Sequence, residues 1–315
     1  MSAGRGGWIA FAAIVALGAG CAHRQTEIPD PKVDVKTPIV IELASNLPPT
    51  VSAKVDGRPG LVMIVDTGAS TSSIDLTAAR KLGFDVRPYA TSGRSTGSDG
   101  RSISFEGYVP VERVEIGSLV IEDLHVPAID SEVTKIHGWF GILGQDVLGK
   151  MIVVLDAGRL RLHALPPSMD EAGLTSYLSE AKLGKGKWAV APVSFRPCPF
   201  LVFDVAKLES GEVELELDSG ATDTSLPKKV IEALELEEIG SFESHAIAGK
   251  YGGRTYRVQR LGLYGLEISA EVHESELEYG RLGMDILGEL VVLFDAPHGK
   301  VWFHHREEPA PPETR

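Results

Sequence analysis

The chain has 315 residues, 43% of them hydrophobic, and a formal net charge of −13 at pH 7. The length exceeds that of a usual single domain, and the apolar content is sufficient for proper hydrophobic cores. The negative charge argues against nucleic acid as a partner, because binding to phosphates requires a basic surface.

Residues 1–21 have the pattern of a targeting segment. Arg5 gives a positive start, and the apolar run Trp8 to Leu17 is too short for a comfortable membrane span. Cys21 directly follows the small residues Gly18-Ala19-Gly20, so the segment resembles a bacterial lipoprotein lipobox, with its leucine one position early. The resemblance implies that Cys21 is lipidated and, because Ala22 is not a retention signal, that the protein lies at the outer membrane and faces the periplasm. The alternative is an ordinary signal peptide with an incidental cysteine.

The next segments alternate between polar and strand-forming residues. Ala22 to Lys36 is polar and contains Pro29 and Pro31, which predicts a flexible tether. Strands are then expected at Ile39 to Leu43, Val51 to Val55 and Leu61 to Val65. A helix is expected from Leu76 to Leu82, ending at Gly83.

An apolar strand that ends in an aspartate occurs twice in the sequence. Val62 to Val65 leads into Asp66-Thr67-Gly68-Ala69-Ser70, and Val213 to Leu217 leads into Asp218-Ser219-Gly220-Ala221-Thr222. One such tripeptide is a weak signal, since it also marks ordinary turns. Two of them, each followed by alanine and a hydroxyl residue, indicate a half-site that is built twice.

The repeat extends beyond the motif. Asp218 follows Asp66 by 152 residues, and Gly280 to Gly288 matches Gly141 to Gly149 at an offset of 139. Strands Met151 to Asp156 and Leu290 to Asp295 then close the two copies. The pattern indicates a duplicated lobe whose second copy has lost residues in its middle.

Two glycine-rich segments follow the aspartates. Gly93 to Gly100 and Gly249 to Gly253 have the composition of hairpin tips, and a solvated surface turn is the plain alternative. Gly93 to Gly97 also satisfies the Gly-x-Ser-x-Gly elbow of serine hydrolases. It lacks the preceding strand and the following helix that the elbow requires, so we set it aside.

The two lobes are joined by an expected helix. Ser168 to Glu171 is a capping-box pattern that predicts a helix through Leu183, with Gly184 as its stop. His304-His305 has no accompanying ligand set, so we expect no metal and no other cofactor. The expected segments are 1–21 signal peptide, 22–36 tether, 37–166 first lobe, 167–187 helical connector, 188–305 second lobe and 306–315 disordered tail.

The chemistry follows from the two carboxylates. Close together, they cannot both ionise cheaply, so the pair would hold one proton. The charged member can take a proton from water while its partner donates one to a carbonyl oxygen. This is general acid–base hydrolysis of an amide without a metal or a covalent intermediate.

With these paired motifs and the later Gly-x-Leu-Gly-x-Asp elements, the chain from about residue 37 to 305 resembles the retropepsin-like aspartic peptidases in a single-chain form. The resemblance implies an all-β fold of two pseudo-symmetric β-barrel lobes with a central cleft, flaps and short helices. It also implies roles: Asp66 and Asp218 as the dyad; Thr67, Gly68, Ser219 and Gly220 as loop support; Ser70, Thr222, Gly97 and Gly249 as contacts to a polypeptide substrate. Leu143-Gly144 and Leu282-Gly283 would brace the loops, and Asp146 and Asp285 would cap short helices.

The chain departs from the pepsin-type pattern three residues after each aspartate. Ala69 and Ala221 stand where those enzymes have a hydroxyl that hydrogen-bonds the carboxylate, so we expect activity nearer to neutral pH. Retroviral relatives carry one motif and dimerise, whereas both half-sites here predict a monomer. The alternative function is a catalytically silent, lipid-anchored module that binds peptides or cell-wall material.

Overall fold

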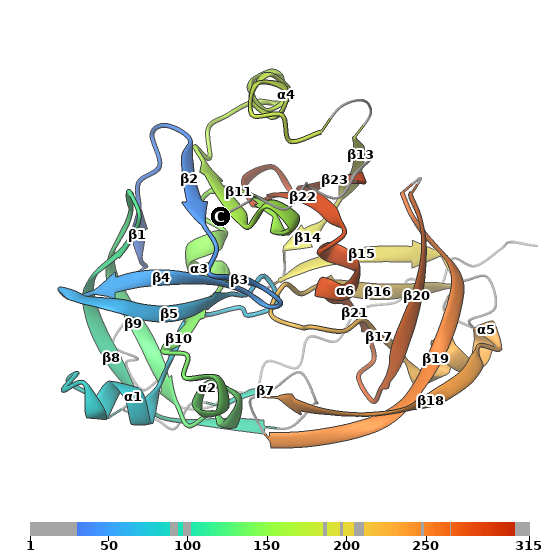
Figure 1. Cartoon of the computed structure of the whole chain (residues 1–315), viewed down its shortest axis with the longest axis horizontal. Helices are drawn as coiled ribbons and strands as arrows, with labels where there is room; N and C mark the ends of the chain where they lie inside the picture. The colour runs from blue at the N-terminus through green and yellow to red at the C-terminus, as the bar shows by residue number, and fades with distance from the viewer. Residues whose placement is uncertain are drawn as a thin grey trace, which may run out of the picture.

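The structure, a computed structural model, describes residues 30–88, 94–96, 102–184, 188–195, 198–204, 211–246, 249–264 and 266–305. Strands dominate it, and they form an N-terminal sheet, a C-terminal sheet and a central sheet that joins them (Figure 1). The all-β class predicted from the sequence is confirmed. In the described ranges, none of the helices has the length and apolar character needed to cross a membrane.

The N-terminal sheet has nine strands in the order β1-β9-β6-β10-β5-β4-β8-β7, with β3 on β4. Because β8 pairs with both β4 and β9, the strands β9, β6, β10, β5, β4 and β8 form a closed ring. The bounds are β1 Lys32–Val33, β3 Ser45–Asn46, β4 Pro49–Val55, β5 Arg58–Val65, β6 Ser73–Asp75, β7 Arg94–Thr96, β8 Ser102–Ile116, β9 Leu119–Ile129, β10 Gly141–Leu143, α1 Leu76–Lys81, α2 Glu132–His137 and α3 Gln145–Leu148.

The C-terminal sheet has eight strands in the order β14-β15-β16-β21-β17-β20-β19-β18. The bounds are β14 Ser194–Phe195, β15 Pro199–Asp204, β16 Glu212–Leu217, β17 Ser225–Pro227, β18 Glu237–Ala246, β19 Gly249–Leu263, β20 Leu266–Ser275, β21 Gly280–Leu282, α5 Lys228–Leu234 and α6 Met284–Leu287. The pairing β16–β21 is parallel and β17–β21 antiparallel, as β5–β10 and β6–β10 are in the N-terminal sheet. The sequence repeat is therefore also a structural repeat around the two aspartates.

The central sheet takes strands from both copies, in the order β13-β23-β22-β11-β12-β2. The bounds are β2 Ile39–Glu42, β11 Ile152–Asp156, β12 Arg161–Leu165, β13 Ala189–Pro192, β22 Leu290–Asp295, β23 Lys300–His305, η1 Ala157–Arg159 and η2 Ala296–His298. Strands β11 and β22 pair antiparallel with Val154 opposite Leu293, its equivalent at the offset of 139. The strands expected to close the two copies thus meet each other on a pseudo-twofold axis.

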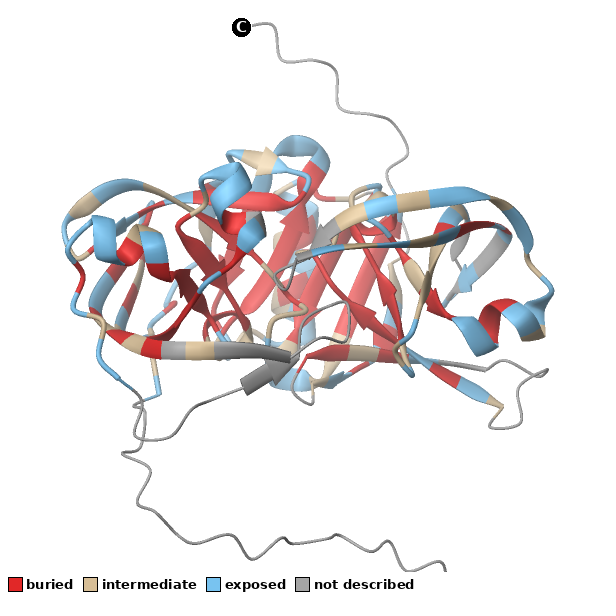
Figure 2. Cartoon of the chain, turned by 90° about the horizontal axis from the view of Figure 1, so that it is seen from below, coloured by how far each residue is buried: buried red, intermediate tan, exposed pale blue. Residues whose placement is uncertain are grey.

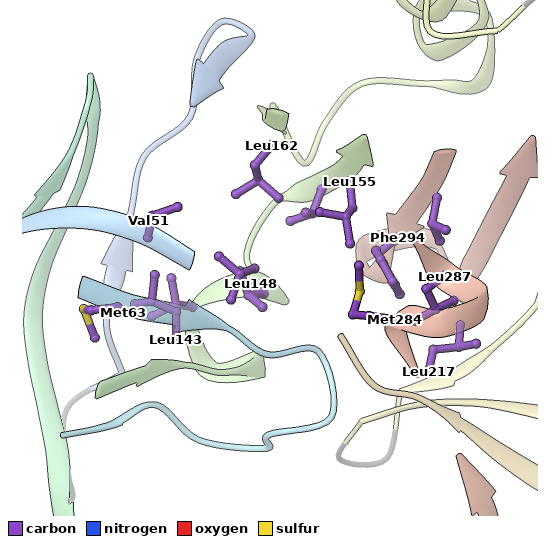
Figure 3. Close-up of a cluster of buried hydrophobic side chains, with 14 of the residues drawn as sticks. Val51, Met63, Leu143, Leu148, Leu155, Leu162, Leu217, Met284, Leu287 and Phe294 are labelled. Carbon is purple, nitrogen blue, oxygen red and sulfur yellow. The ribbon is translucent and has the colours of Figure 1, made fainter. Parts of the chain in front are cut away.

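One hydrophobic core runs through both copies and the central sheet, and buried residues concentrate in the middle of the molecule (Figure 2). Figure 3 shows Met63, Leu143 and Leu148 of the first copy and Leu217 and Phe294 of the second within this core. A second cluster packs under α4 Glu171–Glu180, which covers the other face of the central sheet. Burial of both faces rigidifies the base on which the two aspartate loops stand.

The structure corrects two predicted segments. The end of the predicted tether is folded: Lys32–Val33 pairs with β9, and Val35 is buried. The connecting helix is shorter than expected, because Asp170 rather than Ser168 caps it and it ends at Glu180. The helix after the first motif is confirmed, with Asp75 as its N-cap and Gly83 in a left-handed conformation after it. Residues 1–29 and 306–315 lie outside the described residues.

Candidate active site

The loops that follow β5 and β16 are locked together by four reciprocal hydrogen bonds. The Thr67 hydroxyl donates to the Leu217 carbonyl at 2.6 Å and accepts from the Ser219 N–H at 2.9 Å. The Ser219 hydroxyl donates to the Val65 carbonyl at 2.7 Å and accepts from the Thr67 N–H at 3.0 Å. Both hydroxyl residues are buried, so every one of these backbone groups depends on this exchange.

These four hydrogen bonds place each aspartate against the glycine of the opposite loop. A Cβ added to Gly68 would lie 2.4 Å from Cγ of Asp218, and a Cβ added to Gly220 would lie 2.4 Å from Cγ of Asp66. Only glycine allows this approach. The two carboxyl groups lie within hydrogen-bonding reach of each other, as the sequence predicted.

Each loop also turns its own N–H groups toward its carboxylate. Oδ1 of Asp66 accepts from the N–H groups of Gly68 at 2.9 Å and Ala69 at 3.0 Å. Oδ1 of Asp218 accepts from Gly220 at 2.9 Å and Ala221 at 3.1 Å. These donors fix the orientation of both carboxyl groups.

The Leu-Gly elements brace the loops from behind. The N–H of Asp66 donates to the Leu143 carbonyl, and that of Asp218 donates to the Leu282 carbonyl, both at 3.0 Å. A Cβ on Gly144 would lie within 2.9 Å of three backbone atoms of residues 69–72, so the brace also requires glycine.

The predicted role of Asp146 and Asp285 as helix caps is wrong. The N-caps of α3 and α6 are Gly144 and Gly283, which make no side-chain cap hydrogen bond. Asp146 instead accepts from the N–H and hydroxyl of Ser72. Asp285 does the same for Thr224, so both carboxylates hold the aspartate loops.

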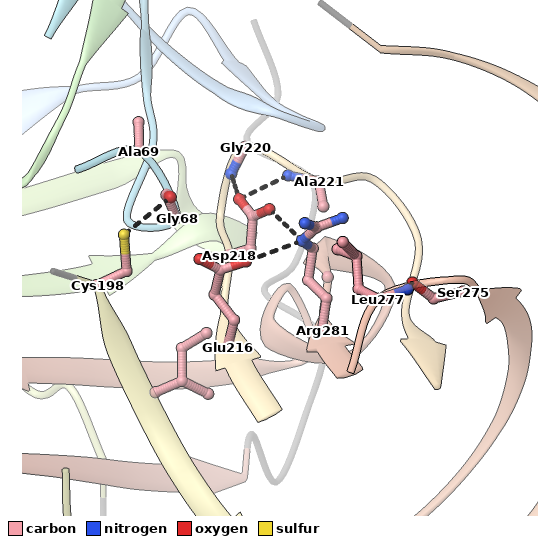
Figure 4. A network of polar contacts seen from close by, with 12 residues as sticks. Gly68, Ala69, Cys198, Glu216, Asp218, Gly220, Ala221, Ser275, Leu277 and Arg281 are labelled. Atoms are coloured by element: carbon pink, nitrogen blue, oxygen red, sulfur yellow. Dashed lines mark hydrogen bonds and ion pairs between the residues drawn. The ribbon is translucent and has the colours of Figure 1, made fainter. Parts of the chain in front are cut away.

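The second copy contains a buried ion pair that the sequence reasoning missed. Nε of Arg281 lies 2.7 Å from Oδ2 of Asp218 and 3.2 Å from Oε2 of Glu216 (Figure 4). Glu216 and Arg281 are 5% and 6% exposed, so solvent does little to screen these charges. The expectation that Asp218 lacks a donor in place of the missing hydroxyl is therefore wrong, because Arg281 supplies one.

The repeat itself carried a signal for this pair. Ile64 stands at the position of Glu216 and Ile142 at that of Arg281, and both pairs face each other across parallel strands. Two charges that replace two isoleucines in one copy of an apolar repeat mark a place where the copies differ in task.

Cys198 closes the site from the side of β15. Its thiol donates to the Gly68 carbonyl at 3.0 Å and so links the second copy to the first aspartate loop. Burial, followed by the negative charge of Glu216, raises the pKa of the Cys198 thiol far above its ordinary value. The thiol is therefore neutral, unlike a nucleophilic cysteine.

The carboxyl groups are strongly perturbed. Desolvation, then the charge of Asp218 and a hydrogen bond with it, raises the pKa of Asp66 well above its usual range. Burial, then the charge of Asp218, raises the pKa of Glu216 to about 7, although Arg281 opposes this. The dyad therefore retains a proton in the pH range where ordinary carboxyl groups are charged.

The structure describes only some of the residues that were predicted to contact substrate. Ser70 is exposed, and the Thr222 hydroxyl donates to the adjacent Asp223 at 2.6 Å. Gly249 begins β19 and forms the last pair of the β18–β19 hairpin with Ala246, and residues 250–253 continue along the strand. Gly97 and Cys21 lie outside the described residues, and the flap role of both glycine-rich segments stays a prediction.

The comparison with known families agrees with this geometry. Residues 51–147 match the family model described as Aspartyl protease. The matched segment contains Asp66, its loop and the Leu143-Gly144 brace, and it ends before the second copy. No curated protein sequence matches the chain. Across the part of the chain that the structure describes, no group of three or more His, Cys, Asp or Glu side chains could hold a metal ion.

The hydrogen bonds of the Thr67 hydroxyl lead to a prediction about the stability of the protein. Thr67→Val keeps the shape of the side chain but leaves the Leu217 carbonyl and the Ser219 N–H unpaired in the interior, at about 1–3 kcal/mol for each group. We expect denaturant unfolding to show a loss of this order. Thr67→Ser keeps the hydroxyl and should lose clearly less. Equal stability of the valine and serine variants would contradict the role of the hydroxyl.

Proposed function

We propose that the protein is an aspartic endopeptidase that cleaves extended polypeptides with a water molecule activated between Asp66 and Asp218. The observation that carries the proposal is the pair of carboxyl groups within hydrogen-bonding reach, each held against the glycine of the opposite loop. Support also comes from the match of residues 51–147 to the aspartyl protease family model. Since one chain supplies both aspartates, we propose that a monomer suffices.

The first step is the attack of water on the peptide carbonyl. Asp218, charged beside Arg281, takes a proton from the water as its oxygen bonds to the carbonyl carbon. Asp66 donates its proton to the carbonyl oxygen, which gives a tetrahedral diol. At this point Asp218 is protonated and Asp66 is charged.

The second step breaks the carbon–nitrogen bond. Asp218 donates its proton to the leaving nitrogen, and Asp66 takes a proton from one hydroxyl of the diol as the carbonyl re-forms. The products are a carboxylic acid and an amine, and the dyad returns to its starting protonation.

One observation favours the second candidate function, a catalytically silent module that binds peptides or cell-wall material. Arg281 engages Oδ2 of Asp218 and therefore competes with water for that oxygen. Such a module would bind an extended peptide and leave it intact, so cleavage of a peptide library separates the two functions.

The proposal predicts that each aspartate is essential. Asp66→Asn and Asp218→Asn should each lower kcat/KM on a cleaved peptide by about 10²–10⁴-fold or more, since each removes a proton donor or acceptor. Asp123→Asn is a matched control: the side chain of Asp123 is half-exposed, and asparagine tolerates its positive φ of 57°. Retained cleavage in either dyad variant would contradict the mechanism.

The pH dependence follows from the raised pKa of Asp66. The active dyad carries one proton, so activity is lost as pH rises through the raised pKa of Asp66 and again at low pH, where the dyad takes up a second proton. We expect a bell-shaped profile of kcat/KM centred at mildly acidic to neutral pH. An optimum near pH 3, the range of unperturbed carboxyl groups, would contradict this assignment.

We also propose that the protein is anchored by a lipid on Cys21 and faces the periplasm from the outer membrane, as its resemblance to lipoprotein precursors suggests. Cys21→Ala should move the protein from the membrane to the soluble fraction of the cell envelope while leaving peptide cleavage intact. Equal membrane association of the wild type and the variant would remove the anchor from the proposal.

A further inference from the structure

One pair of facing positions is apolar in the first half of the site and charged in the second. In the first copy Ile64 on β5 lies opposite Ile142 on β10, and both are buried. In the second copy Glu216 on β16 lies opposite Arg281 on β21, and both are buried as well. The main-chain hydrogen bonds to the two aspartates are equivalent, so the charged pair makes the surroundings of the two carboxyl groups unequal.

Such a pair is costly to keep in the interior. Two charges buried together lose hydration, and replacing them by apolar residues of similar size is often neutral or stabilising. The first copy shows that the same strands pack with isoleucine at both positions. The fold therefore does not require Glu216 and Arg281, which points to a role at the dyad.

The contacts of Arg281 show which carboxyl group it serves. Its Nε lies closer to Asp218, at 2.7 Å, than to Glu216, at 3.2 Å. Among the residues that the structure describes, the hydrogen-bond donors to Asp66 are two main-chain N–H groups of its own loop. A guanidinium stabilises the charged form of a carboxyl group in contact with it, whereas the apolar pair of the first copy gives Asp66 no such help.

We propose that Glu216 and Arg281 are positioning residues that polarise the dyad, so that Arg281 keeps Asp218 charged as the base and leaves the proton on Asp66 as the acid. Glu216 holds the guanidinium and balances its charge. This inference rests on the proposed peptidase function and assigns the two proton-transfer roles within it. In a symmetric dyad, by contrast, the two carboxyl groups would share the proton.

Other titratable groups around the pair are consistent with this assignment. Cys198 is a neutral thiol, since burial and the nearby charge of Glu216 raise its pKa. Burial, then the charge of Glu216, raises the pKa of Tyr279, which therefore adds no charge near neutral pH. With Asp66 protonated, the charges at this centre are those of Asp218, Glu216 and Arg281. The positive charge of Arg281 therefore faces two negative charges until pH falls to about 7, where Glu216 takes a proton.

The second copy can be converted into the likeness of the first. Glu216→Ile with Arg281→Ile reproduces the pair Ile64 and Ile142 and leaves the net charge of the protein unchanged. Arg281→Lys keeps a cation, and Glu216→Gln keeps the shape of its side chain without the charge. The charge-matched control is Lys300→Gln with Glu171→Gln. It removes an exposed ion pair whose Nζ and Oε2 atoms are 3.0 Å apart and which is remote in sequence from both aspartates.

The first readout is the position of the proton, measured by carbon-13 NMR titration of the aspartate carboxyl groups in the wild-type protein. The Asp66→Asn variant assigns the signal of Asp66. We expect Asp66 to titrate at a higher pH than Asp218. Between the two titrations, Asp66 should carry the proton and Asp218 should be charged. A proton on Asp218, or one shared equally in the wild type, overturns the proposal whether or not any variant folds.

The second readout is the pH profile of kcat/KM. In the double isoleucine variant the acidic limb should move up by about 1–3 pH units, the usual effect of removing an opposite charge from a carboxyl group. Arg281→Lys should restore most of that shift, and the control variant should match the wild type. An unchanged profile in a folded double isoleucine variant would show that the pair is only structural and would overturn the inference.

The two proposals fail in different ways. If the wild-type protein cleaves no peptide but its NMR titration shows the proton on Asp66, the peptidase function fails and the polarised pair stands. If the wild type cleaves peptides and both readouts show a symmetric dyad, the function stands and the polarisation fails.

Discussion

The exchange of hydroxyl hydrogen bonds between Thr67 and Ser219 is the contact on which the site depends. Each hydroxyl is both donor and acceptor to main-chain atoms of the opposite copy, so neither loop is satisfied without the other. The glycines then allow the loops to approach closely. The two carboxyl groups meet because the hydrogen bonds already hold the two backbones together. The chemistry is a consequence of how buried polar groups are paired.

This backbone symmetry makes the asymmetry of the charges informative. Equivalent main-chain donors surround both carboxyl groups, and the central sheet places Val154 opposite its own counterpart, Leu293. Against that background, Glu216 and Arg281 stand out as a pair of charges with no equivalent in the first copy. Their desolvation cost has to be offset by contacts with each other and with Asp218.

Much of this could be predicted from the sequence, because strand periodicity and the repeated motif are local signals. The strands at Ile39, Val51, Leu61 and Leu290, the helix at Leu76 and the meeting of the two aspartates were all expected, and the structure places them so. Capping was harder to predict, since Ser168 and Asp170 are both good N-caps and only the fold selects one.

The buried ion pair could not be read from strand alternation. In Val213-Glu214-Leu215-Glu216-Leu217 the two glutamates fall on one face, which predicts that both are solvated. Glu214 is exposed, but Glu216 is buried, because the end of β16 is covered on both faces where the copies meet. Only tertiary contacts decide this, and the same holds for Arg281 in the short strand β21.

The pseudo-twofold pairing of β11 with β22 has the form of an interface between two identical subunits, in which every residue would occur twice. In such an assembly any substitution that favoured one aspartate would equally favour the other, and a guanidinium beside each would stabilise the charged form of both alike. Joining the halves in one polypeptide removes that restriction. It allows acid and base to evolve separately, so that a division of labour barred to a homodimer becomes available by point mutation.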